Sequence, residues 1–313
     1  MIKVGIIGLG AIGQRLIPLF SNHQETKIVA ICDTLEERVQ ETSSQLESVF
    51  TFTNHLEMLE NTELDLIYVT VPPKYHYSVV SDVIAKGINV LCEKPLANST
   101  EEALGLYTQA KEKGIFHAMN FPLNYNVGSK SFASLIKSGY VGDLKRIELK
   151  MRFPNWPRLW QQNEWVATKE QGGYVLEVGV HYIQQIQKIF GNLKVNTKHM
   201  QYPADPIASE NGIIAFLELE DGTPVLIDGL SQIAGEEEIK FTAYGSKGTL
   251  SLVNWANLEG GKIGEPIQQI EADQTLADSL IDNLVKSLKG EEATIIDFSE
   301  GYKAQLVLEA LRG

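Results

Sequence analysis

The chain is poor in cysteine and in basic residues, and it contains no long apolar run. Its 313 residues include two cysteines, Cys32 and Cys92, each at the end of an apolar segment typical of a buried strand. This pattern favours free buried thiols in a reducing compartment over a disulfide. The six histidines show no zinc-type spacing, so we expect no metal site.

Acidic residues outnumber basic ones, 40 to 27, which gives a formal net charge of −13. This charge argues against nucleic acid or an anionic membrane as a partner. No apolar run approaches the ~18 residues of a membrane span. Met1 leads directly into a predicted strand, which leaves no room for a signal peptide, so we expect a cytoplasmic protein.

The first predicted strand runs directly into closely spaced glycines. Residues 2–8 are almost all apolar, as in a strand covered on both faces, and a helical pattern follows the glycines. Glycines at this spacing allow a tight turn and a close approach of backbone to a pyrophosphate. The predicted dinucleotide contacts are Gly8, Leu9, Gly10, Ala11 and Ile12. Pro18 predicts a kink or a local break in the helix.

The second predicted strand, 27–32, ends in Asp33, twenty residues after Gly13. A carboxylate at this offset accepts hydrogen bonds from the adenosine ribose and repels a 2′-phosphate, which favours NAD over NADP. Asp33 also suits the cap of a helix predicted over 34–46, and the two roles are compatible. Arg38 is near enough in sequence to tolerate a phosphate.

Two further predicted strands end in residues suited to a cofactor crevice. The run 65–71 stops at a proline pair, so Val71 and Pro72 are expected to line the nicotinamide side, and His76 either contacts the cofactor or caps the next helix. The run 88–97 contains Glu93 and Lys94 at the carboxyl edge of the sheet, where ligands bind. A lysine there can hydrogen-bond a hydroxyl or its alkoxide, unless the pair is a surface ion pair.

Strand and helix alternate up to residue 120, which predicts a dinucleotide-binding domain over 1–120 built as a Rossmann doubly wound parallel sheet. Over 121–313 we expect an α+β domain for substrate binding and oligomerisation. Its β-type runs predict a large, mostly antiparallel open sheet: 144–153, 195–202, 212–220, 224–232, 238–244 and 249–253. The run 213–217 is apolar on both faces, so one face is expected to meet a partner subunit unless a helix of this chain covers it. Helical patterns over 275–289 and 302–311 close the chain and could pack back on the first domain.

A glycine pair and a helical pattern mark a second candidate site. Gly172 and Gly173 precede a helix that would place Glu177 and His181 one turn apart on one face. An imidazole titrates near neutral pH and can take up a hydroxyl proton, and the carboxylate can fix its tautomer or hold a substrate hydroxyl. A structural hydrogen bond between the two is the alternative.

Three of the four tryptophans lie in one loop just upstream, together with Arg158. Indole faces suit the C–H faces of sugars and a guanidinium suits a carboxylate or phosphate, which makes Trp160 and Arg158 candidate substrate contacts. Large aromatic residues also anchor loops and subunit contacts, and both interpretations stay open.

In combination, these motifs resemble the glucose–fructose oxidoreductase, inositol dehydrogenase and MocA (Gfo/Idh/MocA) family over nearly the whole chain. The residues that carry the resemblance are Gly8-Leu-Gly10-Ala-Ile-Gly13, Pro72 with His76, Cys92-Glu-Lys94-Pro95-Leu, and Gly172-Gly173 with Glu177 and His181. The resemblance implies substrate binding and proton transfer by Lys94 and His181. It also implies sugar, cyclitol or polyol substrates and a homodimer or homotetramer formed through the C-terminal sheet.

Three positions depart from the family pattern. The family usually has Asp at the position of Glu177, often Asp at that of Gln184, and commonly Arg-Phe at that of Asn124-Tyr125. These departures leave the predicted proton-transfer pair intact, and Tyr125 is included among the predicted substrate contacts.

The sequence thus predicts an NAD-dependent oxidoreductase acting on a secondary alcohol of a sugar, cyclitol or related polyol. His181 would remove the hydroxyl proton, Lys94 would stabilise the oxygen, and Glu177 would orient His181 or the substrate. Two alternatives on the same scaffold are an NAD-using glycoside hydrolase with no net redox change and a non-catalytic NAD-responsive binding protein.

Overall fold

A computed structural model describes residues 1–161 and 163–313. The chain divides into two compact units: Met1–Phe121 with Ser279–Gln305, and Pro122–Asp278 with Leu306–Gly313. Residues 279–305 therefore lie in the first unit, whereas the sequence pattern assigned them to the second domain. An amphipathic pattern reveals that a helix has a buried face, but it does not identify the surface that buries it. Among the described residues, no helix has both the length and the apolar character needed to cross a membrane.

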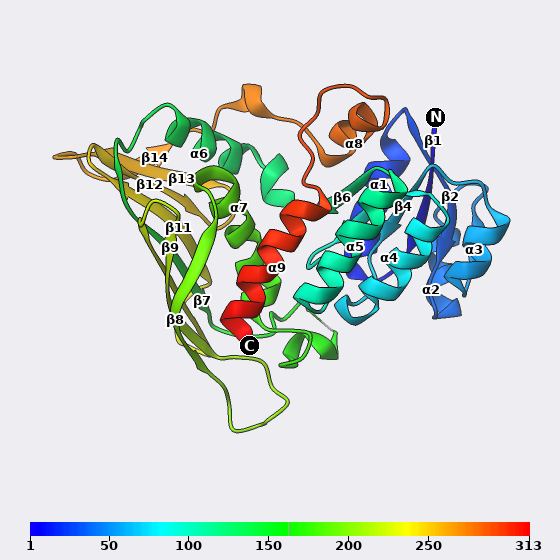
Figure 1. Cartoon of the computed structure of the whole chain (residues 1–313), viewed down its shortest axis with the longest axis horizontal. Helices are drawn as coiled ribbons and strands as arrows, with labels where there is room; N and C mark the ends of the chain where they lie inside the picture. The colour runs from blue at the N-terminus through cyan, green and yellow to red at the C-terminus, as the bar shows by residue number, and fades with distance from the viewer. Residues whose placement is uncertain (162) are drawn as a thin grey trace. The chain divides into compact units, whose positions relative to one another are not determined.

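The first unit contains a six-stranded parallel sheet with the order β3-β2-β1-β4-β5-β6 (Figure 1). The strands β1, β4 and β5 are buried along most of their length, as a sheet covered on both faces requires. This confirms the predicted Rossmann sheet. Because the strands are parallel, their carboxyl ends share one edge. The strand bounds are β1 Ile2–Ile7, β2 Thr26–Cys32, β3 Phe50–Phe52, β4 Leu66–Val69, β5 Asn89–Glu93 and β6 His117–Asn120.

Helices connect these strands, and the first one is continuous through Pro18. The expected break is therefore absent, although Pro18 cannot donate a backbone hydrogen bond to the Gln14 carbonyl. Leu16, Ile17 and Phe20 are buried, and this packed face outweighs the missing bond. The helix bounds are α1 Ala11–Asn22, α2 Glu36–Ser43, α3 His55–Asn61, η1 Pro73–Tyr75, α4 His76–Ala85 and α5 Thr100–Lys113.

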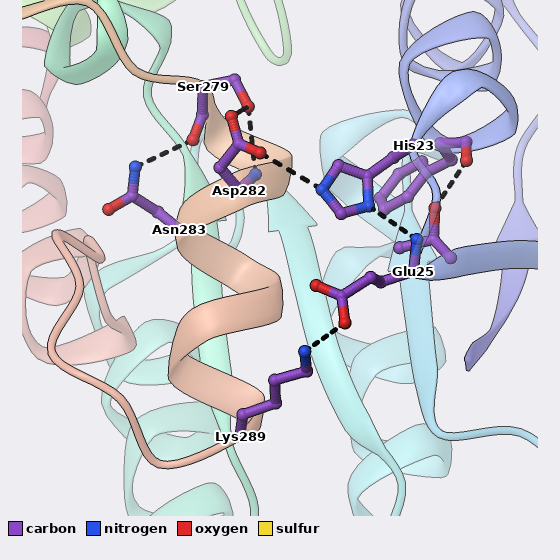
Figure 2. Close-up of polar contacts among 8 residues, drawn as sticks. His23, Glu25, Ser279, Asp282, Asn283 and Lys289 are labelled. Carbon is purple, nitrogen blue, oxygen red and sulfur yellow. Dashed lines mark hydrogen bonds and ion pairs between the residues drawn. The ribbon is translucent and has the colours of Figure 1, made fainter.

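A polar cluster attaches helix α8, Leu280–Leu288, to the first unit (Figure 2). Ser279 caps the helix by accepting the Asp282 N–H at 3.0 Å, and Asp282 lies 3.2 Å from His23 Nε2. Glu25 pairs with Lys289 at the other end of the helix. Exposed ion pairs contribute only ~0–1 kcal/mol each, so the burial of apolar residues supplies most of the free energy that holds α8 in the first unit. These residues are Leu280, Ile281, Leu284 and Val285.

The second unit is built on an eight-stranded sheet with the order β14-β13-β12-β11-β7-β10-β9-β8. Among the described residues of this sheet, only the β7–β10 pair is parallel, which confirms the predicted mostly antiparallel sheet. Helices α6, Val127–Lys137, and α7, Val180–Phe190, lie on one face (Figure 1). The strands are β7 Leu144–Phe153, β8 Leu193–Gln201, β9 Gly212–Leu219, β10 Pro224–Ser231, β11 Glu238–Gly245, β12 Gly248–Val253, β13 Asn257–Lys262 and β14 Gln268–Ile270.

The other face of this sheet is exposed at β9 and β10. Ile214 is 47% exposed and Phe216 is 55% exposed, whereas Ile213 and Leu217, which point to the helix side, are buried. Residues 1–161 and 163–313 therefore place no helix over these two side chains. The alternative that this chain covers its own apolar strand is excluded for that part of the chain.

The chain ends in helix α9, Phe298–Arg312, and the division between the two units falls within it. Short helical turns connect the remaining parts: η2 Pro122–Tyr125, η3 Glu164–Ala167, the π-helical turn Val175–Gly179, and η5 Gln274–Leu276.

Candidate active site

The glycine turn after β1 meets the carboxylate at the end of β2. The Leu9 N–H donates to Asp33 Oδ2 at 2.8 Å. Gly8 has a φ of +98°, and a Cβ there would lie 2.6 Å from the Thr70 carbonyl oxygen, so only glycine fits. A Cβ on Gly10 would meet no described protein atom within 4 Å. The turn is thus open at the position where a pyrophosphate approaches the backbone, and these residues fit a dinucleotide.

Asp33 serves its own helix as well as the glycine turn. Its Oδ1 accepts the Leu35 N–H at 2.9 Å, at the start of α2, and its side chain is 8% exposed. Arg38 Nη1 lies 3.7 Å from Asp33 Oδ2, on a side chain that is 44% exposed. A carboxylate suits ribose hydroxyls and a guanidinium suits a phosphate, so both chemistries are present at this position.

His76 joins two segments of the same edge from the inside. Its Nε2 lies 2.8 Å from the Val71 carbonyl oxygen and its Nδ1 lies 2.7 Å from the Pro95 carbonyl oxygen. The ring is fully buried, and burial lowers the pKa of His76, although both carbonyls oppose the shift. His76 therefore fastens the turn after β4, which contains Val71 and Pro72, to the turn that follows Lys94. A direct contact with the cofactor stays a prediction.

Glu93 links three strand ends. Its Oε1 accepts hydrogen bonds from the Tyr68 hydroxyl and from Asn120 Nδ2, each at 2.6 Å. Burial raises the pKa of Glu93, and these donors and the Lys94 charge partly oppose the shift. These hydrogen bonds hold the ends of β4, β5 and β6 together. Lys94, which is half-buried, directly follows Glu93 in the sequence.

In the second unit, the segment with Glu177 is not a regular α-helix. Val175–Gly179 forms a π-helical turn, and α7 begins at Val180, so Glu177 lies in the π turn and His181 lies in the first turn of α7. A helical segment was predicted here, and the structure adds that Glu177 lies in its π turn. A π turn closes i→i+5 bonds and is wider than an α turn, and such turns are frequent at functional sites. His181 is 6% exposed, and Glu177 is half-buried.

Sequence reasoning missed Trp255, which packs against His181. The two ring centroids lie 5.4 Å apart with the rings at 74°, an edge-to-face contact that restricts the imidazole. Trp255 and Asn254 have φ values of +75° and +46° in the turn between β12 and β13. Asparagine tolerates this conformation, but that signal alone does not identify the residue that the turn presents.

In the loop that contains Trp156 and Trp160, Arg158 is held by other residues of this chain. Arg158 Nε and Nη2 donate to Glu237 at 2.9 and 2.7 Å, and the guanidinium lies over the Phe153 and Trp156 rings. Trp156 is buried, whereas Trp160 is 50% exposed. Arg158 thus has an intramolecular carboxylate partner, and substrate binding by Arg158 or Trp160 stays a prediction.

Two departures from the family pattern contact each other. Asn124 Nδ2 donates to Gln184 Oε1 at 2.9 Å, and Lys188 Nζ donates to Asn124 Oδ1 at 2.8 Å. Asn124 and Gln184 are buried, and Tyr125 lies half-buried beside them in η2. The two substitutions therefore act together: neutral amides form the contact and avoid the desolvation of a charged pair.

Two family descriptions match most of the chain. Residues 2–121 match "Oxidoreductase family, NAD-binding Rossmann fold" and residues 130–251 match "GFO/IDH/MocA C-terminal domain". An uncharacterised oxidoreductase of Synechocystis sp. is 26% identical, over 98% of this chain and 92% of its own length. The 2,7-anhydro-N-acetylneuraminate hydratase of Escherichia coli is also 26% identical, over 62% of this chain and 50% of its own length.

Solved structures show the same fold. The WlbA dehydrogenase from Bordetella pertussis, in complex with NADH and UDP-GlcNAcA, superposes with a TM-score of 0.86 at 19% identity, covering 99% of this chain and 94% of its own. The 3-ketoreductase KijD10 from Actinomadura kijaniata, in complex with NADP and TDP-benzene, superposes with a TM-score of 0.85 at 20% identity, covering 99% and 97%. Neighbours with this fold thus contain either NADH or NADP.

The contact between Asn124 and Gln184 gives a testable stability effect. Gln184→Ala or Asn124→Ala alone should lower the free energy of unfolding of the second unit by about 1–3 kcal/mol, because each leaves a buried amide without this partner. The double variant should lose less than the sum, with a coupling of about 0.5–3 kcal/mol. Tryptophan fluorescence during urea unfolding measures this, because all four tryptophans lie in the second unit. Strictly additive losses would contradict the contact.

Proposed function

Because this chain belongs to the GFO/IDH/MocA family of NAD-binding oxidoreductases, we propose that it transfers hydride between NAD and a secondary alcohol of a sugar, cyclitol or related polyol. The first unit binds the dinucleotide and the second binds the substrate. The main support for the proposal is found at one edge of the parallel sheet. There the glycine turn contacts Asp33, His76 joins the turns after β4 and β5, and Lys94 follows β5. The ligand UDP-GlcNAcA, named for the Bordetella dehydrogenase, supports a sugar substrate.

A nicotinamide dinucleotide held by the first unit would supply the hydride chemistry at the substrate carbon. The His181 imidazole takes the hydroxyl proton as the hydride leaves the same carbon, so the alcohol becomes a carbonyl. The Lys94 ammonium donates a hydrogen bond to the oxygen and stabilises its developing negative charge. Glu177 orients His181 or holds a neighbouring hydroxyl, and Tyr125, Arg158 and Trp160 contact the rest of the substrate.

We assign NAD as the preferred cofactor, with NADP disfavoured. Asp33 repels a 2′-phosphate and suits the ribose hydroxyls, while Arg38 beside it lowers the cost of a phosphate. The enzyme acts in the cytoplasm, where its free buried thiols, Cys32 and Cys92, stay reduced.

The protein works as a homodimer or homotetramer formed through the exposed face of β9 and β10. Ile214, Phe216 and Leu230 form an apolar patch on this face beside the Arg152–Asp228 ion pair, and ion pairs Lys150–Glu238 and Lys240–Glu259 cover the neighbouring strands. When two copies pair through this face, the apolar side chains of both copies become buried. The ion pairs of one copy then stay aligned with those of the other.

Removing either proposed catalytic group should abolish turnover but not cofactor binding. Lys94→Ala and His181→Ala should each lower kcat/KM about 10²–10⁴-fold, because proton transfer or oxyanion stabilisation is lost. Turnover is measured by NADH absorbance with a panel of sugars, cyclitols and sugar acids. Cofactor binding is measured by NADH fluorescence titration. Lys74→Ala and His199→Ala, at exposed positions, are the controls. Parallel losses of turnover and NADH affinity would contradict these roles, and glycoside cleavage without NADH accumulation would indicate a hydrolase.

Replacing Asp33 should change cofactor preference. Asp33→Ser should raise KM for NAD about tenfold, equivalent to ~1.4 kcal/mol, and should improve the use of NADP because Arg38 then meets a phosphate unopposed. The ratio of kcat/KM values for the two cofactors measures the effect. Adding Arg38→Ala should reverse the gain with NADP. An unchanged ratio in Asp33→Ser would disprove the assignment.

An acidic residue on the exposed apolar face should prevent subunit association. Phe216→Asp places a carboxylate among Ile214 and Leu230, and the desolvation of that charge opposes burial of the face. Light scattering during size-exclusion chromatography should give the mass of one chain for Phe216→Asp and a multiple for the wild type. Ile263→Asp, at a 69% exposed position outside this face, should retain the wild-type mass. An equal mass for all three proteins would refute the interface.

A further inference from the structure

We propose that Glu210 and Arg312 are positioning residues, which hold the start of the helical segment with Glu177 and His181 in the geometry that proton transfer requires. The inference rests on the proposed function for its catalytic consequence, but the positioning itself is a property of the second unit. Neither residue was indicated by a motif, because both are far in sequence from the segment that they hold.

Glu210 occupies the space that a side chain on Gly173 would need. Gly173 has a φ of +96°, and a Cβ there would lie 2.1 Å from Glu210 Oε2. The other carboxylate oxygen, Oε1, accepts the Val175 N–H at 2.8 Å. The first residues of a helix have N–H groups without intrahelical partners, and Glu210 supplies an acceptor for one of them. The glycine is thus required by both the backbone conformation and the carboxylate.

Arg312 holds the other side of the same turn. Its Nη2 donates to the Lys169 carbonyl oxygen at 2.5 Å and to the Gly172 carbonyl oxygen at 3.0 Å. The Glu177 N–H in turn donates to the Gly173 carbonyl oxygen at 2.8 Å. One chain of contacts therefore leads from Arg312 through the glycine pair to the backbone of Glu177.

Burial makes the Glu210 contact more effective than a similar contact at the surface. Glu210 is 2% exposed, and burial raises its pKa, while the Val175 N–H and the Arg312 charge oppose this shift. Hydrogen bonds that involve a charged group are shorter and stronger than neutral ones, and a buried one is little weakened by salt. The segment continues into a π turn, which is wider than an α turn, and external contacts of this kind help to hold its start in place.

Lys198 provides a matched control at the same end of α9. Lys198 lies in strand β8, and its Nζ donates to the Ala310 carbonyl oxygen at 2.7 Å and also to the Gly313 carbonyl oxygen. Lys198 therefore anchors the same helix end but contacts neither glycine of the turn. Lys198→Ala tests whether anchoring of α9 is sufficient to explain an effect of Arg312→Ala.

Hydrogen–deuterium exchange of the full-length protein, without substrate, tests the positioning directly. Arg312→Ala and Glu210→Ala should accelerate exchange at the amides of residues 174–181 about tenfold, with peptides of the first unit unchanged. Arg312→Lys and Glu210→Gln, which keep a donor or an acceptor, should give intermediate rates. Lys198→Ala should leave residues 174–181 as in the wild type. Unchanged exchange in both alanine variants, or equal acceleration in Lys198→Ala, would overturn the proposal.

Kinetics with a polyol that the panel identifies test the consequence. Arg312→Ala and Glu210→Ala should lower kcat about 10–100-fold, because a displacement of about 1 Å at the reacting groups costs this much. KM for NAD and NADH binding should stay at wild-type values. If no polyol is turned over, the proposed function fails and the exchange experiment still decides the positioning. If exchange rises but kcat does not fall, the positional role in catalysis is disproved.

Discussion

The common edge of parallel strands is the constraint on which the first unit depends. Six strands run in one direction, so the residues that follow β1, β2, β4 and β5 meet at one edge although they are dispersed over some ninety positions of the sequence. The Leu9–Asp33 bond joins the first two ends, and His76 joins the other two. The backbone groups, the carboxylate and the lysine that we propose for a pyrophosphate, a ribose and a substrate oxygen thus follow strands of one sheet, in a protein with no net positive charge.

The second unit uses a different principle, because its proposed catalytic groups lie on a helical segment held from outside. The Gly172–Gly173 turn leads into a π turn and then into α7, and each part has an external contact: Arg312 and Glu210 at the glycines, Trp255 at His181, and Asn124 at Gln184. Together these contacts favour one conformation of the segment. Small polar contacts distant from the reacting groups are therefore part of the site.

Local patterns in the sequence predicted the elements that local physics determines. Buried strands such as β1 and β7 were evident from apolar runs and alternation, and the glycine turn from its spacing. β3, with its exposed Phe50, is three residues long and carries too little apolar signal to be recognised. The π turn, Trp255 and the contacts of Asn124, Glu210 and Arg312 depend on residues brought together only by tertiary structure. The hydrophobic periodicity of a sequence cannot identify residues that become neighbours only in the folded chain.

In the proposed mechanism, one group from each unit acts on the same substrate carbon. A crystal structure of the enzyme with NADH and a polyol product or inhibitor measures this most directly. The Lys94 ammonium and the His181 imidazole should both lie within about 2.6–3.2 Å of the oxygen on the carbon that faces the nicotinamide ring. If either group lies out of hydrogen-bond reach of that oxygen, directly and through a bridging water, the proposed catalytic pair is contradicted.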